Sequence, residues 1–231
     1  MTIAENIARI RANMAAAARE AGRDPKEILL VGASKMNDAA ACREAVAAGI
    51  DALGENRVQE MVQKLEQHAY DGAPLHFIGH LQRNKVKQVV GHVALIQSVG
   101  SLELLDEIEK VAAARGLVQD ILLEVNIGRE AAKSGFAPEK VLPAAEASLE
   151  RTHVRVRGLM TIPPADAQRD ANFRYFQEVQ ALYVDMNEKL FHNELEYLSM
   201  GMSGDYEDAV RCGATMVRVG TAIFGARHYT L

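Results

Sequence analysis

Tryptophan is absent from this 231-residue chain, cysteine occurs only twice, and no apolar run approaches the roughly 20 residues of a membrane-spanning helix. Cys42 and Cys212 lack the spacing of metal ligands and are too few for a disulfide framework, so we expect a reducing cytoplasm. The segment 2–21 contains Glu5 and Arg9 among its apolar residues, which indicates an amphipathic helix rather than a signal peptide. These absences argue against a secreted or membrane protein.

Basic residues do not dominate the chain either. The 26 Lys and Arg stand against 31 Asp and Glu, which leaves a formal net charge of −5. This balance gives no general attraction to nucleic acid or acidic lipid, so neither is an expected partner. The run Arg83, Lys85 and Lys87 lacks aromatic neighbours and is typical of a solvated helix start rather than an RNA-binding surface. Any anion site must therefore be local.

The common catalytic motifs are also missing. The chain contains no Gly-x-Ser-x-Gly elbow, no Walker phosphate loop and no His-Glu-x-x-His sequence. His76 and His80 lie close together, but no third ligand has a recognisable spacing, so we expect a hydrogen-bonded histidine at a strand end rather than a metal site. The common hydrolase classes are therefore not expected.

What the chain does contain is a regular alternation of short apolar runs and amphipathic segments. The predicted strands are 28–34, 51–55, 75–81, 94–99, 120–126, 155–162, 197–202 and 216–224. The predicted helices between them are 38–48, 56–68, 84–91, 101–115, 138–149, 170–190 and 205–212. Such alternation is typical of βα units, and eight of them predict a single (β/α)8 TIM-barrel domain over residues 1–231, with an extra N-terminal helix at 2–21.

An open, doubly wound sheet is the alternative fold. That fold favours a Gly-rich turn after the first strand. Here the first predicted strand ends in Ser34-Lys35-Met36-Asn37 instead. The barrel is therefore the better interpretation.

Three segments at predicted strand ends carry groups that suit a phosphorylated aldehyde. Lys35 follows the first strand, Ser203-Gly204 follows the seventh, and Gly220-Thr221 lies in or after the eighth. In such a barrel the loops after the last two strands frequently hold phosphate, and barrel closure brings them near the first strand. An unprotonated lysine amine attacks aldehydes, and backbone N–H groups at a helix N-terminus hold phosphate. Pyridoxal 5′-phosphate (PLP) carries both an aldehyde and a phosphate.

Two further residues extend this hypothesis. Asp205 is the expected N-cap of the helix that follows Ser203-Gly204. Arg218 lies two residues before Gly220 and shares its strand face. Because arginine only donates hydrogen bonds, Arg218 beside a pyridine nitrogen would favour the unprotonated ring, a weaker electron sink than a ring paired with a carboxylate.

Eight segments spread over nearly the whole chain carry a family resemblance. They are Ser34-Lys35, Gly54-Glu55-Asn56, His76 to Lys85, Glu124-Val125-Asn126, Lys133-Ser134-Gly135, Gly158-Leu159-Met160, Ser199 to Ser203, and Arg218 to Thr221 with Phe224-Gly225. These segments resemble the pyridoxal 5′-phosphate homeostasis protein family (YggS/PROSC type), which is itself similar to the N-terminal barrel domain of alanine racemase.

The resemblance implies roles for individual residues. Lys35 would hold PLP as a Schiff base, Ser203, Gly220 and Thr221 would bind the phosphate, and Arg218 would face the pyridine nitrogen. The residues implied to line the pocket are Asn56, His80, Asn126, Met160 and Met200. The chain departs from the family pattern at Met36, Arg57 and Gly100, where threonine, an aromatic residue and aspartate are common.

The resemblance also implies a role in intracellular vitamin B6 and amino-acid homeostasis, with PLP-dependent apoenzymes as possible recipients. Related racemases take a second base from a C-terminal β-domain and a partner subunit. Because the chain ends at Leu231, we expect no such domain, and hence a monomeric carrier or regulator without strong catalysis. A small PLP-dependent amino-acid racemase is the alternative, and a Schiff-base aldolase acting on a phosphorylated sugar ranks third.

Overall fold

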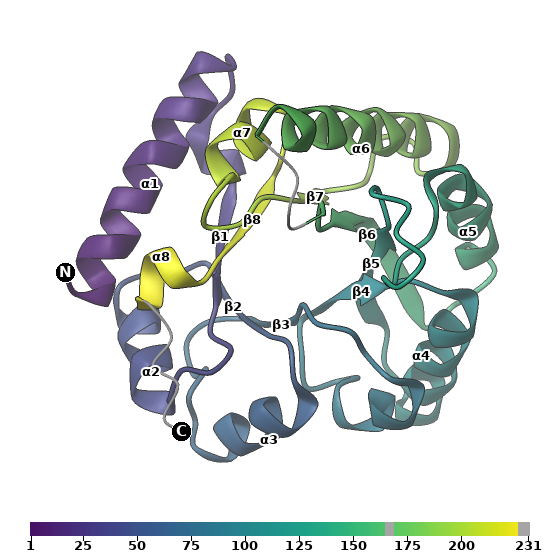
Figure 1. The fold of residues 1–231 in the computed structure, drawn as a ribbon. Coiled ribbons are helices and arrows are strands. Elements are labelled where there is room, and N and C mark those ends of the chain that lie inside the picture. Colours follow the sequence, from purple (N-terminus) through teal and green to yellow (C-terminus); the bar gives the residue numbers. More distant parts are fainter. Residues whose placement is uncertain (165–168, 226–231) are drawn as a thin grey trace.

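Eight short strands pair in parallel, in chain order, and close on themselves in the computed structural model, which describes residues 1–164 and 169–225 (Figure 1). The strands are β1 (Leu29–Ala33), β2 (Ala52–Glu55), β3 (Leu75–Phe77), β4 (Leu95–Val99), β5 (Gln119–Val125), β6 (Val154–Thr161), β7 (Tyr197–Ser199) and β8 (Met216–Val219). β8 pairs with β1, with Val31 opposite Arg218. The predicted (β/α)8 barrel is confirmed, and each predicted strand corresponds to an observed one.

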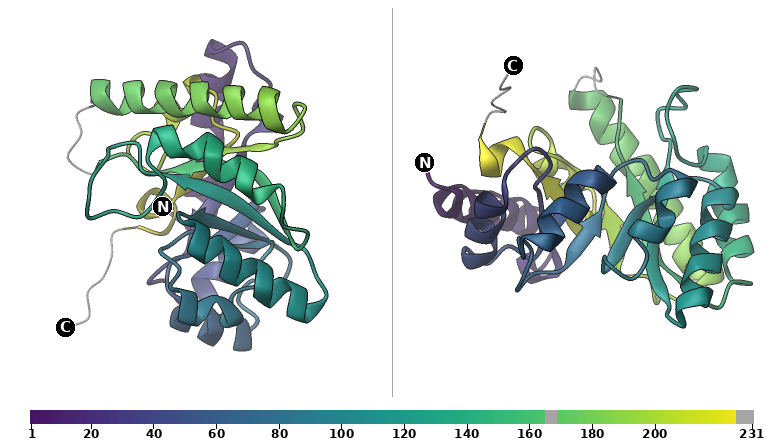
Figure 2. Two further views of the ribbon diagram at one scale, coloured as in Figure 1. Left: turned by 90° about the vertical axis from the view of Figure 1, so that its right-hand side faces the viewer. Right: turned by 90° about the horizontal axis from the view of Figure 1, so that it is seen from below.

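Helices surround the strands in all three ribbon views (Figures 1 and 2). The α-helices are α1 (Ile3–Glu20), α2 (Ala39–Ala47), α3 (Val58–Glu66), α4 (Leu102–Arg115), α5 (Val141–Ser148), α6 (Arg169–Leu190), α7 (Tyr206–Arg211) and α8 (Thr221–Phe224). Short 3₁₀ helices are η1 (Pro25–Glu27), η2 (Arg83–Gln88) and η3 (Pro138–Lys140). None of these helices has the length and apolar character needed to cross a membrane, within the residues described.

The extra N-terminal helix, α1, packs against α8. It begins with a capping box in which Thr2 and Glu5 bond to each other's backbone N–H groups. Its buried Asn6 donates from Nδ2 to the Ile223 carbonyl at 2.9 Å, and Arg9 donates to the Ala222 carbonyl at 3.4 Å. The first helix therefore fixes α8, the last helix described.

The structure corrects several predicted boundaries, including that of β7, which ends at Ser199 rather than at 202. The single strand predicted over 216–224 is wrong in its second half, because β8 ends at Val219 and residues 221–224 form α8. β3 ends at Phe77 rather than at 81. A Cβ on Gly79 would lie 2.3 Å from the Asn56 carbonyl oxygen, so the chain there packs against the turn after β2. The segment predicted as a helix at 84–91 is the 3₁₀ helix η2.

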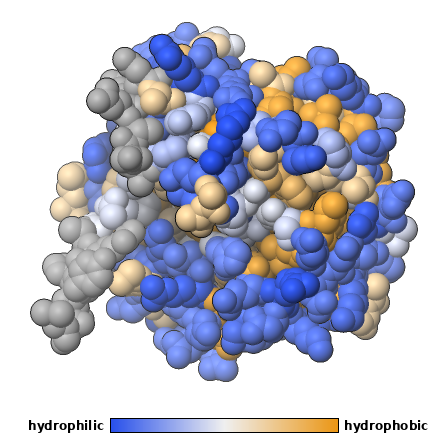
Figure 3. All heavy atoms as spheres, turned by 45° about the vertical axis from the view of Figure 1, so that its right-hand side comes forward, coloured by the Kyte–Doolittle hydropathy of each residue, from blue (hydrophilic) through white to orange (hydrophobic). Residues whose placement is uncertain are grey.

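Side chains alternate between two hydrophobic clusters along the strands. Strand residues fill the barrel interior, and their buried members are Val31, Ala52, Leu95, Leu122, Met160 and Met216. A larger cluster joins outward-facing residues such as Val217 and Val219 to the surrounding helices. Hydrophilic residues cover most of the face shown in Figure 3, with apolar residues between them. By this alternation Arg218 faces the barrel interior, on the side of the apolar layer toward the carboxyl ends of the strands.

Candidate functional site

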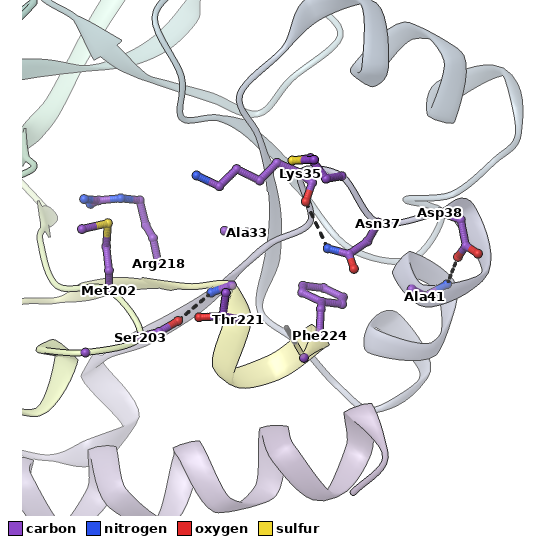
Figure 4. A pocket seen from close by; sticks show the side chains of 14 residues that line it. Ala33, Lys35, Asn37, Asp38, Ala41, Met202, Ser203, Arg218, Thr221 and Phe224 are labelled. Carbon is purple, nitrogen blue, oxygen red and sulfur yellow. Dashed lines mark hydrogen bonds between the residues drawn. The ribbon is translucent and has the colours of Figure 1, made fainter. Parts of the chain in front are cut away.

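A cavity of about 490 Å³ opens where β1, β7 and β8 end. Its lining residues are Ala33, Lys35, Met36, Asn37, Asp38, Ala41, Met202, Ser203, Gly204, Arg218, Gly220, Thr221, Phe224 and Gly225. Figure 4 shows the side chains of Lys35 and Arg218 pointing into one space, with Ser203 and Thr221 at its margin. The fold therefore brings together the three segments that the sequence singled out, in a volume typical of small-molecule sites.

The turns after β7 and β8 are joined through one hydroxyl. Ser203 Oγ accepts hydrogen bonds from the backbone N–H groups of Gly220 at 3.2 Å and Ala222 at 3.3 Å. A Cβ on Gly220 would lie 3.3 Å from the Ala33 carbonyl oxygen, so glycine lets this turn lie close to β1. A Cβ on Gly204 would meet nothing within 4 Å, which leaves that backbone open.

This arrangement fits the phosphate of PLP. The hydroxyls of Ser203 and Thr221 line the same cavity as Lys35, and Ser203 Oγ accepts from the Gly220 and Ala222 N–H groups, from which a phosphate oxygen would accept in its place. Within the described chain, no group of three His, Cys, Asp or Glu side chains is arranged to hold a metal ion. The donors therefore suit an anion, and the nearby Lys35 amine suits an aldehyde on the same molecule.

Asp205 acts differently from the prediction. It occupies the N-cap position of α7, but its side chain makes no capping bond to that helix. One carboxylate oxygen instead accepts from the Met202 N–H at 2.6 Å, and the other accepts from Asn172 Nδ2 at 3.1 Å. Burial raises the pKa of Asp205. The carboxylate thus shapes the turn that carries Ser203.

Arg218 is held in place by groups from two other strands. Its guanidinium is 3% exposed and donates to Ser199 Oγ at 2.5 Å and to the Thr161 carbonyl at 2.8 Å. Burial lowers its pKa to about 10, against the opposing charges of Asp205 and Glu124. The group therefore stays protonated at neutral pH and presents a fixed cation to the cavity.

A directional chain of hydrogen bonds continues from Arg218 across the barrel. Ser199 Oγ donates to Gln97 Oε1 at 2.7 Å, and Gln97 Nε2 donates to His76 Nδ1 at 2.9 Å. Burial lowers the pKa of His76 to about 4, so the ring is neutral at physiological pH. The sequence analysis gave no role to Gln97, a polar residue in the middle of β4, and quoted Ser199 only as part of a family segment.

We expect His76 to make folding sensitive to acid. An unfolded histidine takes up a proton near pH ~6.5, whereas folded His76 resists protonation down to pH about 4, so stability falls as the pH decreases through this window. Between pH 7 and pH 5 this loss is about 2 kcal/mol. Urea unfolding at both pH values should show a smaller decrease for His76→Gln than for the wild type.

The control for this experiment is His68, whose side chain is 80% exposed. His68→Gln should retain the acid sensitivity of the wild type. Equal losses between pH 7 and pH 5 in the wild type and His76→Gln would contradict the assignment.

The five remaining predicted pocket residues lie outside the lining of this cavity. Met160 is buried in the barrel-interior cluster, and Met200 is buried in the outer cluster. Asn126 bonds to both backbone groups of Glu130, at 2.9 Å and 3.2 Å. His80 is exposed, and Asn56 has a buried Oδ1 without a partner among the described residues. The structure therefore gathers the lysine, the anion donors and the arginine, but not these five.

Comparison with known proteins agrees with this geometry. The family model for the alanine racemase N-terminal domain matches residues 6–228. A pyridoxal phosphate homeostasis protein from Pseudomonas aeruginosa is 42% identical over 99% of this chain and 97% of its own length. The chain belongs to the pyridoxal phosphate homeostasis protein family. The resemblance inferred from the sequence segments is confirmed.

Solved structures extend the comparison. The structure of PipY from Synechococcus elongatus with PLP bound is 32% identical, with a TM-score of 0.85 over 97% of this chain and 100% of that chain. An alanine racemase from Clostridium difficile is 18% identical, with a TM-score of 0.71 over 89% of this chain and 53% of that chain, which shows a shared fold.

One departure from the pattern of the homeostasis family has a clear structural setting. A Cβ on Gly100 would lie 2.6 Å from the Gly135 nitrogen and 3.1 Å from a carboxylate oxygen of Glu124. That oxygen accepts a hydrogen bond from Ser134 at 3.0 Å, and burial raises the pKa of Glu124. Glycine at position 100 therefore lets the Ser134-Gly135 segment lie against the ends of β4 and β5, away from the cavity lining.

Proposed function

We propose that this protein holds PLP as a Schiff base on Lys35 and serves intracellular PLP and amino-acid homeostasis. The observation that carries the proposal is the common cavity in which Lys35 faces Arg218 beside the hydroxyls of Ser203 and Thr221. The bound cofactor supplies an electrophilic aldehyde and a conjugated ring. Each of these groups has a matching residue in the cavity.

The residues divide the work of binding. Lys35 would supply the amine that bonds to the aldehyde carbon of PLP, with the aldehyde oxygen released as water. Ser203, Gly204, Gly220 and Thr221 would hold the phosphate through hydroxyl and backbone N–H groups, with a phosphate oxygen replacing Ser203 Oγ as the acceptor of the Gly220 N–H. The Arg218 guanidinium would donate to the ring nitrogen and, because it accepts no hydrogen bond, would favour the unprotonated ring.

We infer a carrier or regulator rather than a strong catalyst. Among the described residues that line the cavity, Asp38 is the only carboxylate, and no histidine, tyrosine or cysteine is present. Asp38 accepts from the Ala41 N–H at 2.8 Å as the cap of α2, so it is already engaged. A two-base racemase needs a second proton donor opposite the lysine, and this lining does not offer one.

The wider role follows from this inference. We propose that the chain acts in the cytoplasm as a monomer with one PLP-binding domain, and that PLP-dependent apoenzymes receive the cofactor from it. The low cysteine content supports a reducing compartment. Transfer of PLP should appear as activation of an apoenzyme when it is mixed with the PLP-loaded protein.

The decisive experiment is to load the purified protein with PLP, reduce it with borohydride and map the modified peptide. We expect a yellow protein and a single stable adduct on Lys35. An adduct on another lysine, or no adduct, would reject the proposal.

Two further assays test the alternatives. Sustained, Lys35-dependent inversion of L-amino acids under chiral detection would favour the racemase. Trapping of a phosphorylated aldehyde sugar by a colourless protein would favour the aldolase.

A further inference from the structure

The residue after Lys35 has a backbone conformation that L-amino acids rarely adopt. Met36 has a φ of 63°, in the left-handed region that favours glycine and asparagine. Such a conformation costs free energy and persists only where surrounding contacts fix it. The turn that carries Lys35 therefore depends on the groups that hold it.

Those groups form a buried cluster on the outer side of β1 and β2, which we call the Lys64 network and which consists of Lys64, Glu55 and Glu60. Lys64 Nζ lies 2.7 Å from Glu55 Oε1, 2.8 Å from Glu60 Oε1 and 2.9 Å from the Ser34 carbonyl oxygen. These three bonds use all three donors of the ammonium group. The side chain of Lys64 is 6% exposed and that of Glu55 is fully buried.

The network holds the chain on both sides of Lys35. On one side, the Ser34 carbonyl accepts from Lys64, and Ser34 Oγ donates to Glu55 Oε1 at 2.6 Å. On the other side, the Met36 N–H donates to Glu60 Oε1. Ser34 therefore contacts the network, whereas Lys35, in the turn after β1, lines the cavity.

Burying the charged groups of this network costs free energy, which a purely structural cluster could avoid. Burial raises the pKa of Glu55, although the charge of Lys64 opposes this effect. For Lys64, burial acts to lower the pKa, but the charge of Glu55 and the hydrogen bonds to Glu55 and Glu60 together outweigh it, and the pKa is raised. The second oxygen of Glu55 has no partner among the described residues. An apolar cluster of similar volume generally stabilises a fold as well or better.

We propose that Lys64, together with Glu55 and Glu60, is a positioning residue that fixes the Ser34–Met36 turn so that the Lys35 amine projects into the cavity. This inference rests on the proposed function of Lys35. The network contacts the turn after β1, whereas Ser203 and Thr221 lie on the turns after β7 and β8. Its loss should therefore impair Schiff-base formation and leave phosphate binding intact.

Three probes separate these two contributions. PLP has an aldehyde and a phosphate, pyridoxal has the aldehyde without the phosphate, and pyridoxine 5′-phosphate has the phosphate without the aldehyde. In Lys64→Met we expect Schiff-base formation with both aldehydes to fall about tenfold or more, because small displacements of a reacting group have large effects. Binding of pyridoxine 5′-phosphate should change less than about twofold, since its phosphate donors are untouched.

The matched control is Lys189→Met, which removes a lysine from an exposed helical ion pair with Asp185. It should behave as the wild type with all three probes. Equal weakening of all three probes in Lys64→Met would show general loss of the pocket and reject a positioning role. Unchanged binding of both aldehydes would reject it as well.

A second pair of variants gives the same decision if Lys64→Met does not fold. Glu60 is the more exposed carboxylate of the network, and Glu60→Ala, which removes the acceptor of the Met36 N–H, should weaken both aldehydes without affecting pyridoxine 5′-phosphate. Adding Met36→Asn should restore part of that loss, because asparagine adopts positive φ more readily. Failure of this rescue, or of the aldehyde-specific loss, would reject the proposal. A wild type that forms no adduct on Lys35 would instead reject the proposed function itself.

Discussion

Lys35→Ala is expected to abolish the coloured, borohydride-stable adduct. Lys35 is the only lysine among the described residues that line the cavity, so the variant leaves no amine there for the aldehyde. We expect the yield of covalent adduct to fall at least about a hundredfold, because attack by the amine has no substitute in this lining. Absorbance titration with PLP, followed by reduction and mass measurement of the intact protein, gives the yield directly.

The same variant should keep its phosphate site. Binding of pyridoxine 5′-phosphate to Lys35→Ala should match that of the wild type, since Ser203 and Thr221 remain. Lys26→Ala is the control, because Lys26 lies in η1, before β1 and so at the opposite end of the strand from Lys35. A coloured, reducible complex that survives in Lys35→Ala but not in Lys26→Ala would overturn the assignment of the lysine.

Gly158→Ala is expected to prevent stable folding. Gly158 lies in β6 opposite Tyr197 of β7, and a Cβ there would fall 1.7 Å from the Tyr197 carbonyl oxygen. Relief of this overlap requires separation of two paired strands in a closed barrel. We expect a loss of more than about 4 kcal/mol in the free energy of unfolding, measured by urea denaturation and by the yield of folded protein.

Two other glycines test whether a positive φ or the lack of space for a Cβ causes this loss. Gly22 has a φ of 68° and free space around it, so Gly22→Ala should cost only the ~1–2 kcal/mol of a left-handed backbone. Gly204 has neither positive φ nor a neighbour within 4 Å, and Gly204→Ala should leave stability nearly unchanged. If Gly158→Ala resembles either variant in stability, the close approach of β6 and β7 is not a requirement of the fold.

The architecture could be predicted because burial imposes a pattern on the sequence. Strands that are covered on both sides produce short apolar runs, and amphipathic segments lie between them. The same physics explains the error over 216–224. Ala222, Ile223 and Phe224 continue the apolar run of β8, and a short apolar run does not distinguish a strand from a helix.

The candidate site was predictable to the extent that it depends on strand ends. Lys35, Ser203 and Gly220 each follow a strand closely, so closure of the barrel brings them together. The Lys64 network was not predictable in this way. The contact between Lys64 and Ser34 joins the last turn of α3 to the turn after β1, and nothing in the spacing of these two residues indicates that hydrogen bond.

The bond between Asn6 and Ile223 spans 217 positions of sequence, so during synthesis it can form only after α8 has left the ribosome. A nascent chain that has left the ribosome only as far as β7 already carries Lys35, the lysine proposed to hold PLP. It still lacks the Gly220 turn, and α1 has no partner in α8. Cofactor capture should therefore begin only after the last strand emerges and joins the first helix, because such distant contacts form late.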